Sequence, residues 1–272
     1  NRVTMFGALN PLTKVHTFWS RAFASAATAT PVYVVLGATG GIGAEVCGQL
    51  ASSGSQLAIG GRNPEKLDAL IAAYPHAQVS RVDATNSKEV EAFIQKAVAT
   101  YGRVDGVVNC VGSVLLKPAH TTTDDEFNEV INTNLFSAFC AVKAAVKVMS
   151  KQSPKGGSIV LCSSAVAQTG LPNHEAIAAA KAGIVGLARS AAATYAGANI
   201  RVNCVAPGLT RTPMTARITG NETALKMSTS MHALGRIAEA DEVARAIVFL
   251  MDPKNSFITG QVLGVDGGLG SL

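Results

Sequence analysis

Glycines at the spacing Gly37-x-x-x-Gly41-x-Gly43 are the clearest sign of chemistry in this sequence. They follow an apolar, β-branched run, residues 32–36, and open a helical pattern. Glycines let the backbone turn tightly and approach a ligand, and the free amides of a helix N-terminus stabilise a pyrophosphate. A tight turn without a ligand would explain glycines alone. Because strand, glycines and helix coincide, we expect a dinucleotide site that also includes Thr39 and Ile42.

The end of the second predicted strand indicates which dinucleotide is bound. An acidic side chain there would bond the ribose 2′-hydroxyl of NAD, whereas a basic one would pair with the 2′-phosphate of NADP. The sequence has Gly60-Gly61-Arg62-Asn63 and no acid. An ordinary surface charge beside a helix would also explain Arg62. We expect NADP(H) to be preferred, with NAD(H) as the weaker alternative.

The elements that must position these residues alternate regularly from residue 31 onward. Short β-branched runs alternate with longer amphipathic stretches, and the predicted strands are 32–36, 56–60, 78–82, 104–109, 158–163, 199–205 and 261–265. Helix starts are marked by Asn63 before a proline and by the capping-box spacing from Thr123 to Glu126. This rhythm predicts an α/β fold with one Rossmann-type, doubly wound domain. Its seven-stranded parallel sheet would carry helices on both faces and ligands at the carboxyl ends of the strands.

A chain of 272 residues, 48% hydrophobic and 15% charged, can bury a core of ordinary size. No linker or repeat divides it, so we expect a single dinucleotide-binding domain over residues 31–272. Residues 1–30 contain three basic residues, no acid and an Ala/Ser/Thr-rich end. This extension resembles an organellar transit peptide and predicts the mitochondrial matrix, with the plastid as the alternative. A flexible extension without a targeting role is the other explanation.

Composition argues against several other classes. Five widely spaced cysteines without a C-x-x-C pair favour neither a zinc site nor a disulfide framework, so we expect no metal. The formal charge is +5, but three of the 23 basic residues precede residue 31, which leaves 20 basic against 18 acidic residues. Such a nearly neutral domain does not suggest a nucleic-acid partner. No apolar run reaches the roughly 18 residues of a membrane span.

Further motifs follow in order toward the C-terminus: Asn132-Thr133-Asn134-Leu135, Ser163-Ser164 at the end of an apolar run, and Ala180-Lys181-Ala182-Gly183. With the glycine spacing, they resemble the short-chain dehydrogenase/reductase (SDR) family over nearly all of residues 31–270, and its 3-oxoacyl-carrier-protein-reductase-like members in particular. The resemblance implies an oxidoreductase acting on a CH–OH/C=O pair. Asn134, Ser164 and Lys181 would be three members of its catalytic tetrad. Ser164 would polarise the substrate oxygen, while Lys181 and Asn134 organise ribose and water.

The same resemblance assigns residues to the cofactor. Asp83 looks like the family aspartate whose neighbourhood holds the adenine ring. Asn109 and Gly112 stand in an element that braces the central sheet, and Lys181 would also hold the nicotinamide ribose. The residues expected on the nicotinamide side are Pro207, Gly208, Thr210 and Thr212.

The tyrosine that donates a proton in this family has no counterpart here. It stands four residues before the lysine, where this chain has Ile177, and counting thirteen residues from Ser164, the family's usual interval, also reaches Ile177. Tyr195 lies 18 residues further on, about 27 Å along a helix, and cannot replace it. His174 would share a helical face with Ile177 and Lys181 and is the candidate proton donor. Capping the helix start is its other explanation.

Two functions remain open on these residues. The first is an NADP(H)-binding SDR protein with impaired or absent carbonyl reductase activity, a pseudoenzyme that serves as an accessory subunit of an organellar complex. The second is an active NADPH-dependent reductase of a small, 3-oxoacyl-type ketone, with His174 or water as the proton donor. For either we expect a homo-oligomer or a protein complex formed through helices 124–149 and 174–195. Residues 210–232 are predicted to form a mobile lid, whose composition names no substrate.

Overall fold

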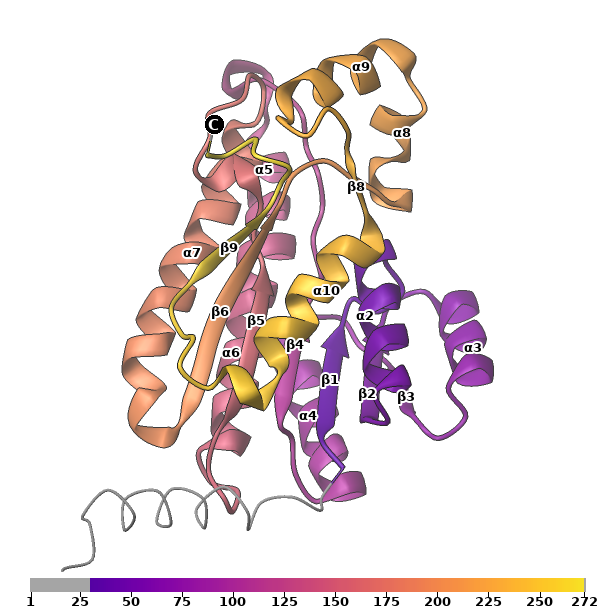
Figure 1. Cartoon of the computed structure of the whole chain (residues 1–272), viewed down its shortest axis with the longest axis vertical. Coiled ribbons are helices and arrows are strands. Elements are labelled where there is room, and N and C mark those ends of the chain that lie inside the picture. The colour runs from indigo at the N-terminus through magenta and orange to yellow at the C-terminus, as the bar shows by residue number, and fades with distance from the viewer. Residues whose placement is uncertain (1–29, 272) are drawn as a thin grey trace, which may run out of the picture. The chain divides into compact units, whose positions relative to one another are not determined.

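Seven parallel strands form one sheet within residues 30–271, the part of the chain that this computed structural model describes (Figure 1). Their spatial order is β3-β2-β1-β4-β5-β6-β9. The strands are β1 (Val32–Leu36), β2 (Gln56–Gly61), β3 (Gln78–Arg81), β4 (Gly106–Asn109), β5 (Gly157–Cys162), β6 (Ile200–Pro207) and β9 (Val262–Val265). The predicted Rossmann-type sheet is confirmed, with strand ends at most two residues from those expected. Residues 1–29 lie outside the described residues, so the predicted N-terminal extension and its boundary stay predictions.

The order of the strands reverses at β1, which is therefore the topological switch point of the sheet. β1 pairs with β2 on one side and with β4 on the other, so that Leu36 lies opposite both Gly60 and Asn109. The connections on the two sides of β1 cover opposite faces, and in sheets of this kind ligands bind at the carboxyl ends of the strands at such a point, here β1 and β4. All five residues of β1 are buried because both faces are covered.

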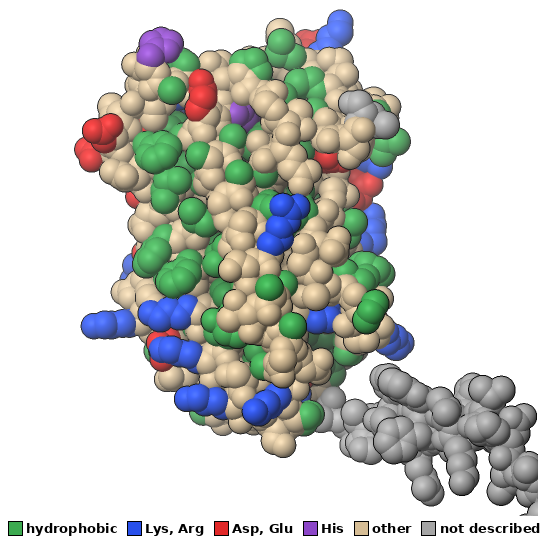
Figure 2. Space-filling view, turned by 90° about the vertical axis from the view of Figure 1, so that its left-hand side faces the viewer, with side chains coloured by type: hydrophobic (Ala, Val, Ile, Leu, Met, Phe, Trp, Pro, Cys, Tyr) green, Lys and Arg blue, Asp and Glu red, His purple; other side chains and the backbone are tan. Residues whose placement is uncertain are grey.

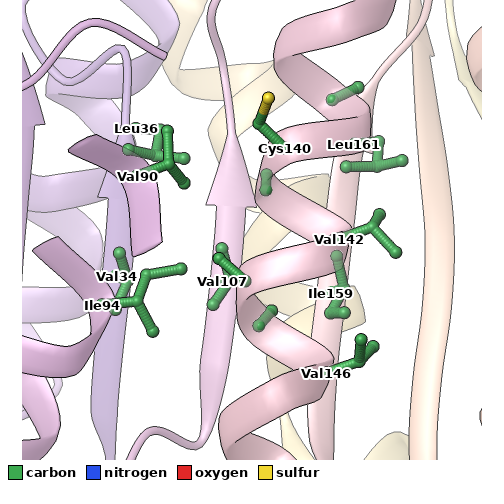
Figure 3. Close-up of a cluster of buried hydrophobic side chains, with 14 of the residues drawn as sticks. Val34, Leu36, Val90, Ile94, Val107, Cys140, Val142, Val146, Ile159 and Leu161 are labelled. Atoms are coloured by element: carbon green, nitrogen blue, oxygen red, sulfur yellow. The ribbon is translucent and has the colours of Figure 1, made fainter. Parts of the chain in front are cut away.

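Two hydrophobic cores lie on the two faces of the sheet, which confirms helices on both sides. One face is covered by α4 (Ser87–Tyr101), α6 (Ser137–Met149) and α7 (Glu175–Tyr195). The other is covered by α2 (Gly41–Ser52) and α10 (Ala240–Met251), with α3 (Pro64–Ala73) alongside. Figure 3 shows the first core, where Val90 and Ile94 of α4 lie beside Leu36 and Val34 of β1.

Both predicted helix starts carry the expected caps. The Asn63 side chain accepts a hydrogen bond from the backbone N–H of Lys66 at 2.9 Å, which begins α3. Thr123 and Glu126 form a reciprocal capping box that begins α5 (Asp124–Ile131). Each cap stabilises its helix by about 1 kcal/mol and determines where it begins.

A π-helical turn, Asn132–Phe136, joins α5 to α6. Helical backbone therefore runs from Asp124 to Met149, the extent predicted for this helix, but with one wider turn inside it. Asn134 lies in the middle of the turn and is fully buried. The turn therefore places an amide side chain in the protein interior.

The segment after β6 forms a small layer of its own. β7 (Thr210–Arg211) pairs with β8 (Ala238–Glu239), and α8 (Ala216–Thr219) and α9 (Glu222–Met231) lie between them in sequence. Figure 1 shows α8 and α9 at the end of the molecule toward which the strands of the large sheet point. The predicted lid thus lies at the ligand edge of the sheet, and its mobility stays a prediction.

One helical stretch within the described residues, Glu175–Ala198, is apolar and long enough to cross a membrane by length and composition. Half of its most apolar window is buried inside the protein. Its buried residues include Ile184 and Ala188, which belong to the core beneath the sheet. This is the position of an ordinary core helix.

Candidate cofactor and active site

The glycine loop after β1 is packed too closely to hold side chains. Gly37 has a φ of +78°, and a Cβ there would lie 2.8 Å from the carbonyl carbon of Cys110. A Cβ on Gly41 would lie 2.8 Å from Cγ2 of Thr212, and one on Gly43 would collide with the Gly37 carbonyl oxygen. Only glycine permits this backbone and these approaches.

The start of α2, directly after this loop, suits an anion. Its N-cap, Gly40, has no side chain to cap the helix, and its first turn contains no acidic residue. The first amides of a helix lack partners within the helix, and the helix dipole favours negative charge there. The amides of Gly41, Ile42 and Gly43 therefore fit a pyrophosphate. Thr39 lies in the same loop.

Arg62 and Arg81 share a pocket beyond the ends of β2 and β3. The pocket has a volume of about 260 Å³ and is also lined by Asp83 and Glu89. Strand pairing places Gly61 opposite Arg81, so the two arginines lie at neighbouring strand ends. Both are exposed, and neither forms an ion pair with a carboxylate in the described part of the chain. Two guanidinium groups suit a phosphate monoester.

Asp83 is held as a carboxylate beside these arginines. Its Oδ1 accepts hydrogen bonds from the backbone N–H of Thr85 at 2.9 Å and from the Thr85 hydroxyl at 2.8 Å. The Thr85 backbone bond, aided by the Thr85 hydroxyl and by the charges of Arg62 and Arg81, lowers the pKa of Asp83 below its ordinary value. Asp83 thus belongs to the turn that bounds the pocket.

Asn134 and Lys181 meet beside Gly112, just beyond the carboxyl end of β4. A Cβ on Gly112 would lie 2.9 Å from Oδ1 of Asn134 and 3.2 Å from Nζ of Lys181. Glycine therefore leaves space for both side chains. Asn109, the last residue of β4, is buried and donates from Nδ2 to the Ser137 hydroxyl at 3.2 Å. This bond ties β4 to α6, the bracing position that the resemblance implies.

The Lys181 ammonium is buried at the end of β5. It donates to the carbonyl oxygen of Cys162 at 2.9 Å. Burial lowers its pKa, and the nearby thiols of Cys162 and Cys110 oppose that shift. A hydrogen bond to Cys162 and burial raise the pKa of the Cys110 thiol, which keeps it protonated. An ammonium has three donors, so this bond leaves Lys181 others for a ligand.

The Asn134 side chain holds the loop after β4 in place. Its Nδ2 donates to the Ser113 hydroxyl at 3.0 Å and to the Val130 carbonyl at 2.9 Å. Its Oδ1 accepts from the backbone N–H of Ser113 at 3.1 Å. The buried amide is thus satisfied within the protein and acts on the site by positioning this loop.

Ser164 keeps its hydroxyl only loosely bonded. It lies after β5 at the start of a short 3₁₀ turn, Ala165–Ala167, where its Oγ accepts from the backbone N–H of Val166 at 3.4 Å. The hydroxyl also lies 3.4 Å from the Pro207 carbonyl. Bonds of this length are weak, so the hydroxyl can turn toward a substrate oxygen. Ser163, by contrast, is buried and donates to the Lys181 carbonyl at 2.9 Å.

Ile177 lies one helical turn before Lys181 and is buried, with 4% of its surface exposed. It belongs to a small apolar cluster. The members of this cluster are Val130, Ala176, Ile177 and Ala180, with Leu115 and Ile131 packed against them. None of these side chains can donate a proton. That Ile177 replaces the family's tyrosine stays a prediction from the spacing.

His174 lies outside the helix that was expected to contain it. α7 begins at Glu175, and His174 is its N-cap, with a φ of −112° and no capping hydrogen bond from its side chain. Its Nδ1 lies 2.7 Å from the carbonyl oxygen of Pro172. The prediction that His174 shares a helical face with Ile177 and Lys181 is therefore wrong, because the backbone of His174 is not helical.

The residues predicted for the nicotinamide side form a bridge across the site, which we call the cofactor segment, residues 207–212. At one end the carbonyl of Pro207 lies beside the Ser164 hydroxyl. At the other end Thr212 packs against Gly41 of the glycine loop. Between them Thr210 is buried and its hydroxyl donates back to the carbonyl of residue 208 at 3.2 Å. The segment thus connects the candidate catalytic serine to the candidate phosphate site.

Sequence reasoning missed two residues of this site. Arg81 could have been found from the sequence, because the predicted strands 56–60 and 78–82 end beside each other in a parallel sheet. Arg62 and Arg81 lie at these two strand ends. His232, which bonds to the cofactor segment, had no such signal, since 23 residues separate it from Leu209, its partner. Within residues 30–271 no group of three or more His, Cys, Asp or Glu could hold a metal ion, and all five cysteines are free thiols.

Known proteins resemble this chain over almost its whole length. Residues 37–270 match the family described as enoyl-(acyl carrier protein) reductase. The 3-oxoacyl-(acyl-carrier-protein) reductase FabG of Thermotoga maritima is 36% identical over 243 residues, which cover 88% of this chain and 97% of that protein. A short-chain type dehydrogenase/reductase from Mycobacterium ulcerans superposes with a TM-score of 0.84 at 29% identity, covering 89% of this chain and 91% of that one.

ElxO, solved with NADP bound, superposes with a TM-score of 0.81 at 30% identity and covers 90% of this chain and 100% of its own. The family match begins in the glycine loop and extends beyond β9, so it includes every motif described above. The chain therefore belongs to the short-chain dehydrogenase/reductase family.

Proposed function

We propose that this protein binds NADP(H) and has impaired or absent carbonyl reductase activity. The observation that carries the proposal is Ile177, buried among apolar side chains one helical turn before Lys181. Hydride transfer to a ketone leaves an alkoxide that must gain a proton, and an isoleucine has none to give. The glycine loop and the arginine pocket, in contrast, retain the features that binding a dinucleotide requires.

The residues present fit NADP(H) better than NAD(H). The glycine loop has no room for side chains where a pyrophosphate would approach. Within the described residues neither Arg62 nor Arg81 forms a direct ion pair with Asp83 or Glu89, which line the same pocket, so both guanidinium groups keep their donors for a 2′-phosphate. A 2′-hydroxyl carries no charge to pair with them. When bound, NADPH supplies a hydride to a carbonyl carbon.

Two side chains support a residual role in carbonyl chemistry. The weak bonds of the Ser164 hydroxyl cost little to exchange for a bond to a substrate oxygen. The donors that Lys181 does not use on Cys162 suit the hydroxyls of a ribose. Both groups would still position cofactor and substrate in a protein that lacks the proton donor.

A second candidate function is an active NADPH-dependent reductase of a small, 3-oxoacyl-type ketone. The retained Ser164 and Lys181 favour it, as does the similarity to the FabG of Thermotoga maritima. The proton would then come from water or from His174. Because Nδ1 of His174 already faces the Pro172 carbonyl, Nε2 is the nitrogen that would transfer the proton.

Two measurements on the purified protein distinguish these functions. Calorimetric titration with NADPH and NADH tests the binding, and an anaerobic single-turnover reaction with NADPH and a 3-oxoacyl thioester tests the chemistry. We expect clear NADPH binding and little or no product. Turnover at about tens per second that His174→Ala abolishes would support the active reductase, since a placed donor contributes about 10² to 10⁴ in rate. Absence of NADPH binding would contradict both.

We also propose that the protein resides in the mitochondrial matrix. The support is the composition of residues 1–30, which contain three basic residues and no acid. Residues 1–30 fused to a fluorescent protein should direct it to mitochondria. Plastid import of the fusion would identify the alternative compartment, and a diffuse signal would refute both.

The proposed role in a homo-oligomer or an organellar complex rests on the outer side of α6 and α7. α7 lies at the left of Figure 1, and the middle of that side carries few charged side chains (Figure 2). The exposed positions of α7 include the small residues Ala182 and Gly186. On α6 and the π turn, Phe136 and Phe139 stack with ring centroids 6.1 Å apart although each is at least 40% exposed. Such a surface suits helix-to-helix contact with another subunit.

A further inference from the structure

We propose that His232 is a positioning residue that holds the cofactor segment in the shape that nicotinamide binding requires. The inference rests on the proposed binding of NADP(H). His232 directly follows α9 at the end of the lid and has only 4% of its surface exposed. A Cβ on Gly208 would lie 2.5 Å from its Nε2, and one on Gly267 would lie 3.5 Å from its Cδ2. The ring is thus enclosed between two glycines.

Both ring nitrogens of His232 face partners whose hydrogen-bonding roles are fixed. Nδ1 lies 2.7 Å from the carbonyl oxygen of Ser228, which can only accept. Nε2 lies 3.1 Å from the backbone nitrogen of Leu209, which can only donate. The imidazole satisfies both only as the neutral ring with its hydrogen on Nδ1. This one ring therefore links the last turn of α9 to the cofactor segment.

The backbone of the cofactor segment is held from several directions at its centre. The carbonyl of Leu209 accepts from the N–H of Ala238 at 3.0 Å, while its N–H donates to His232. The N–H of Gly208 donates to the carbonyl of Val265 at 3.2 Å. Of these three bonds, only the one to His232 uses a side chain. A substitution at 232 therefore removes one of these three bonds, together with the bond of the ring to Ser228, and leaves the two backbone bonds of the segment in place.

A shift at the centre of the segment would reach both ends of the candidate site. The Pro207 carbonyl lies 3.4 Å from the Ser164 hydroxyl, and Thr212 packs against Gly41 of the glycine loop. Losing the His232 bond leaves the Leu209 N–H, half-buried in the structure, without its partner, so the backbone would move to find another. That movement would loosen the nicotinamide side of the cofactor.

The test compares NADPH affinity by calorimetry in His232→Leu, His232→Gln and the control His76→Leu, a histidine at an exposed position. We expect His232→Leu to bind NADPH about tenfold more weakly, the effect of one lost hydrogen bond. Glutamine offers both an acceptor and a donor, so His232→Gln should stay within about threefold of wild type. The control should match wild type.

Several outcomes would overturn the proposal. One is a folded His232→Leu variant that binds NADPH as tightly as wild type. Another is an equal loss of NADPH affinity in His232→Leu and His232→Gln that parallels the fall in their melting temperatures. Nitrogen NMR of the wild-type ring is independent of any variant, and it should report a neutral imidazole protonated on Nδ1. Protonation on Nε2 contradicts the inference. If wild type does not bind NADPH, the proposed function itself fails and this role fails with it.

Discussion

Replacing Ile177 with tyrosine tests whether the missing phenol alone limits the chemistry. The matched control is Ile177→Phe, which adds the same ring without the hydroxyl. A correctly placed general acid contributes about 10² to 10⁴ in rate, equivalent to about 3 to 5.5 kcal/mol of barrier. Lys181 lies one turn further along α7 with donors to spare, and Ser164 is only weakly bonded. Both could act with a phenol at this position.

The structure also predicts a cost of this substitution. Ile177 is 4% exposed and packs in a cluster with Val130, Ala176 and Ala180. A larger ring must displace these neighbours, which costs about 1 to 3 kcal/mol of folding stability. Ile177→Tyr and Ile177→Phe should therefore lower the free energy of unfolding by similar amounts.

The assay is single-turnover reduction of a 3-oxoacyl thioester by deuterium-labelled NADPH, with the labelled alcohol measured by mass spectrometry. We expect Ile177→Tyr to exceed Ile177→Phe by about 10² or more, while wild type and the phenylalanine variant stay similar. Equal gains in both variants would show that ring bulk, rather than the proton donor, limits the reaction. That result would refute the reasoning from Ile177.

Three further predictions follow from the arginine pocket, the Asp83 turn and α7. Arg62→Ala and Arg81→Ala should each weaken NADP(H) binding by about 1.5 to 3 kcal/mol and leave NAD(H) binding unchanged in calorimetry, whereas equal losses for both dinucleotides would contradict a 2′-phosphate contact. Because the pKa of Asp83 is lowered in the folded protein, its charged form stabilises the fold above the ordinary value of 3.8. In urea unfolding, the free energy of unfolding of wild type should exceed that of Asp83→Asn at about pH 6, and this difference should shrink as the pH falls below 3.8. Gly186→Glu, at an exposed α7 position with open space for a side chain, should dissociate an oligomer in light scattering, while Gly197→Glu, equally open, should not. A dimer unaffected by Gly186→Glu would place the interface elsewhere.

Regular elements were predictable because their signals are local. β1 reads as a strand because five apolar residues sit beside a glycine turn, and α3 and α5 begin at caps that the residue types alone indicate. The two-residue strands β7 and β8 were not predicted, since two residues leave no periodicity. The π turn was also missed, because nothing in Asn132–Phe136 differs in composition from an α-helical segment.

The candidate site was predictable where it lies on strand ends and unpredictable where distant segments meet. Gly37, Ser164 and Lys181 follow strands or lie on a helix whose place in the sheet the alternation already indicates. Arg81 could have been found in the same way, because it ends the strand next to β2. His232 takes part only because the fold brings the end of the lid beside the residues that follow β6. His174 was misplaced by a single residue at a helix start, which is where sequence patterns are least informative.

The π turn between α5 and α6 makes the site sensitive to chain length. Its backbone bonds run from i to i+5 instead of i to i+4, so it holds about one residue more than an α-helical turn of the same angular span. Deleting one residue from Asn132–Phe136 would therefore convert it to α-helical geometry and leave buried residues of α6 such as Ala141 facing the core. The cost would fall on Asn134, whose bonds to Ser113 depend on the wider turn, so a one-residue deletion here would damage the site and spare the core.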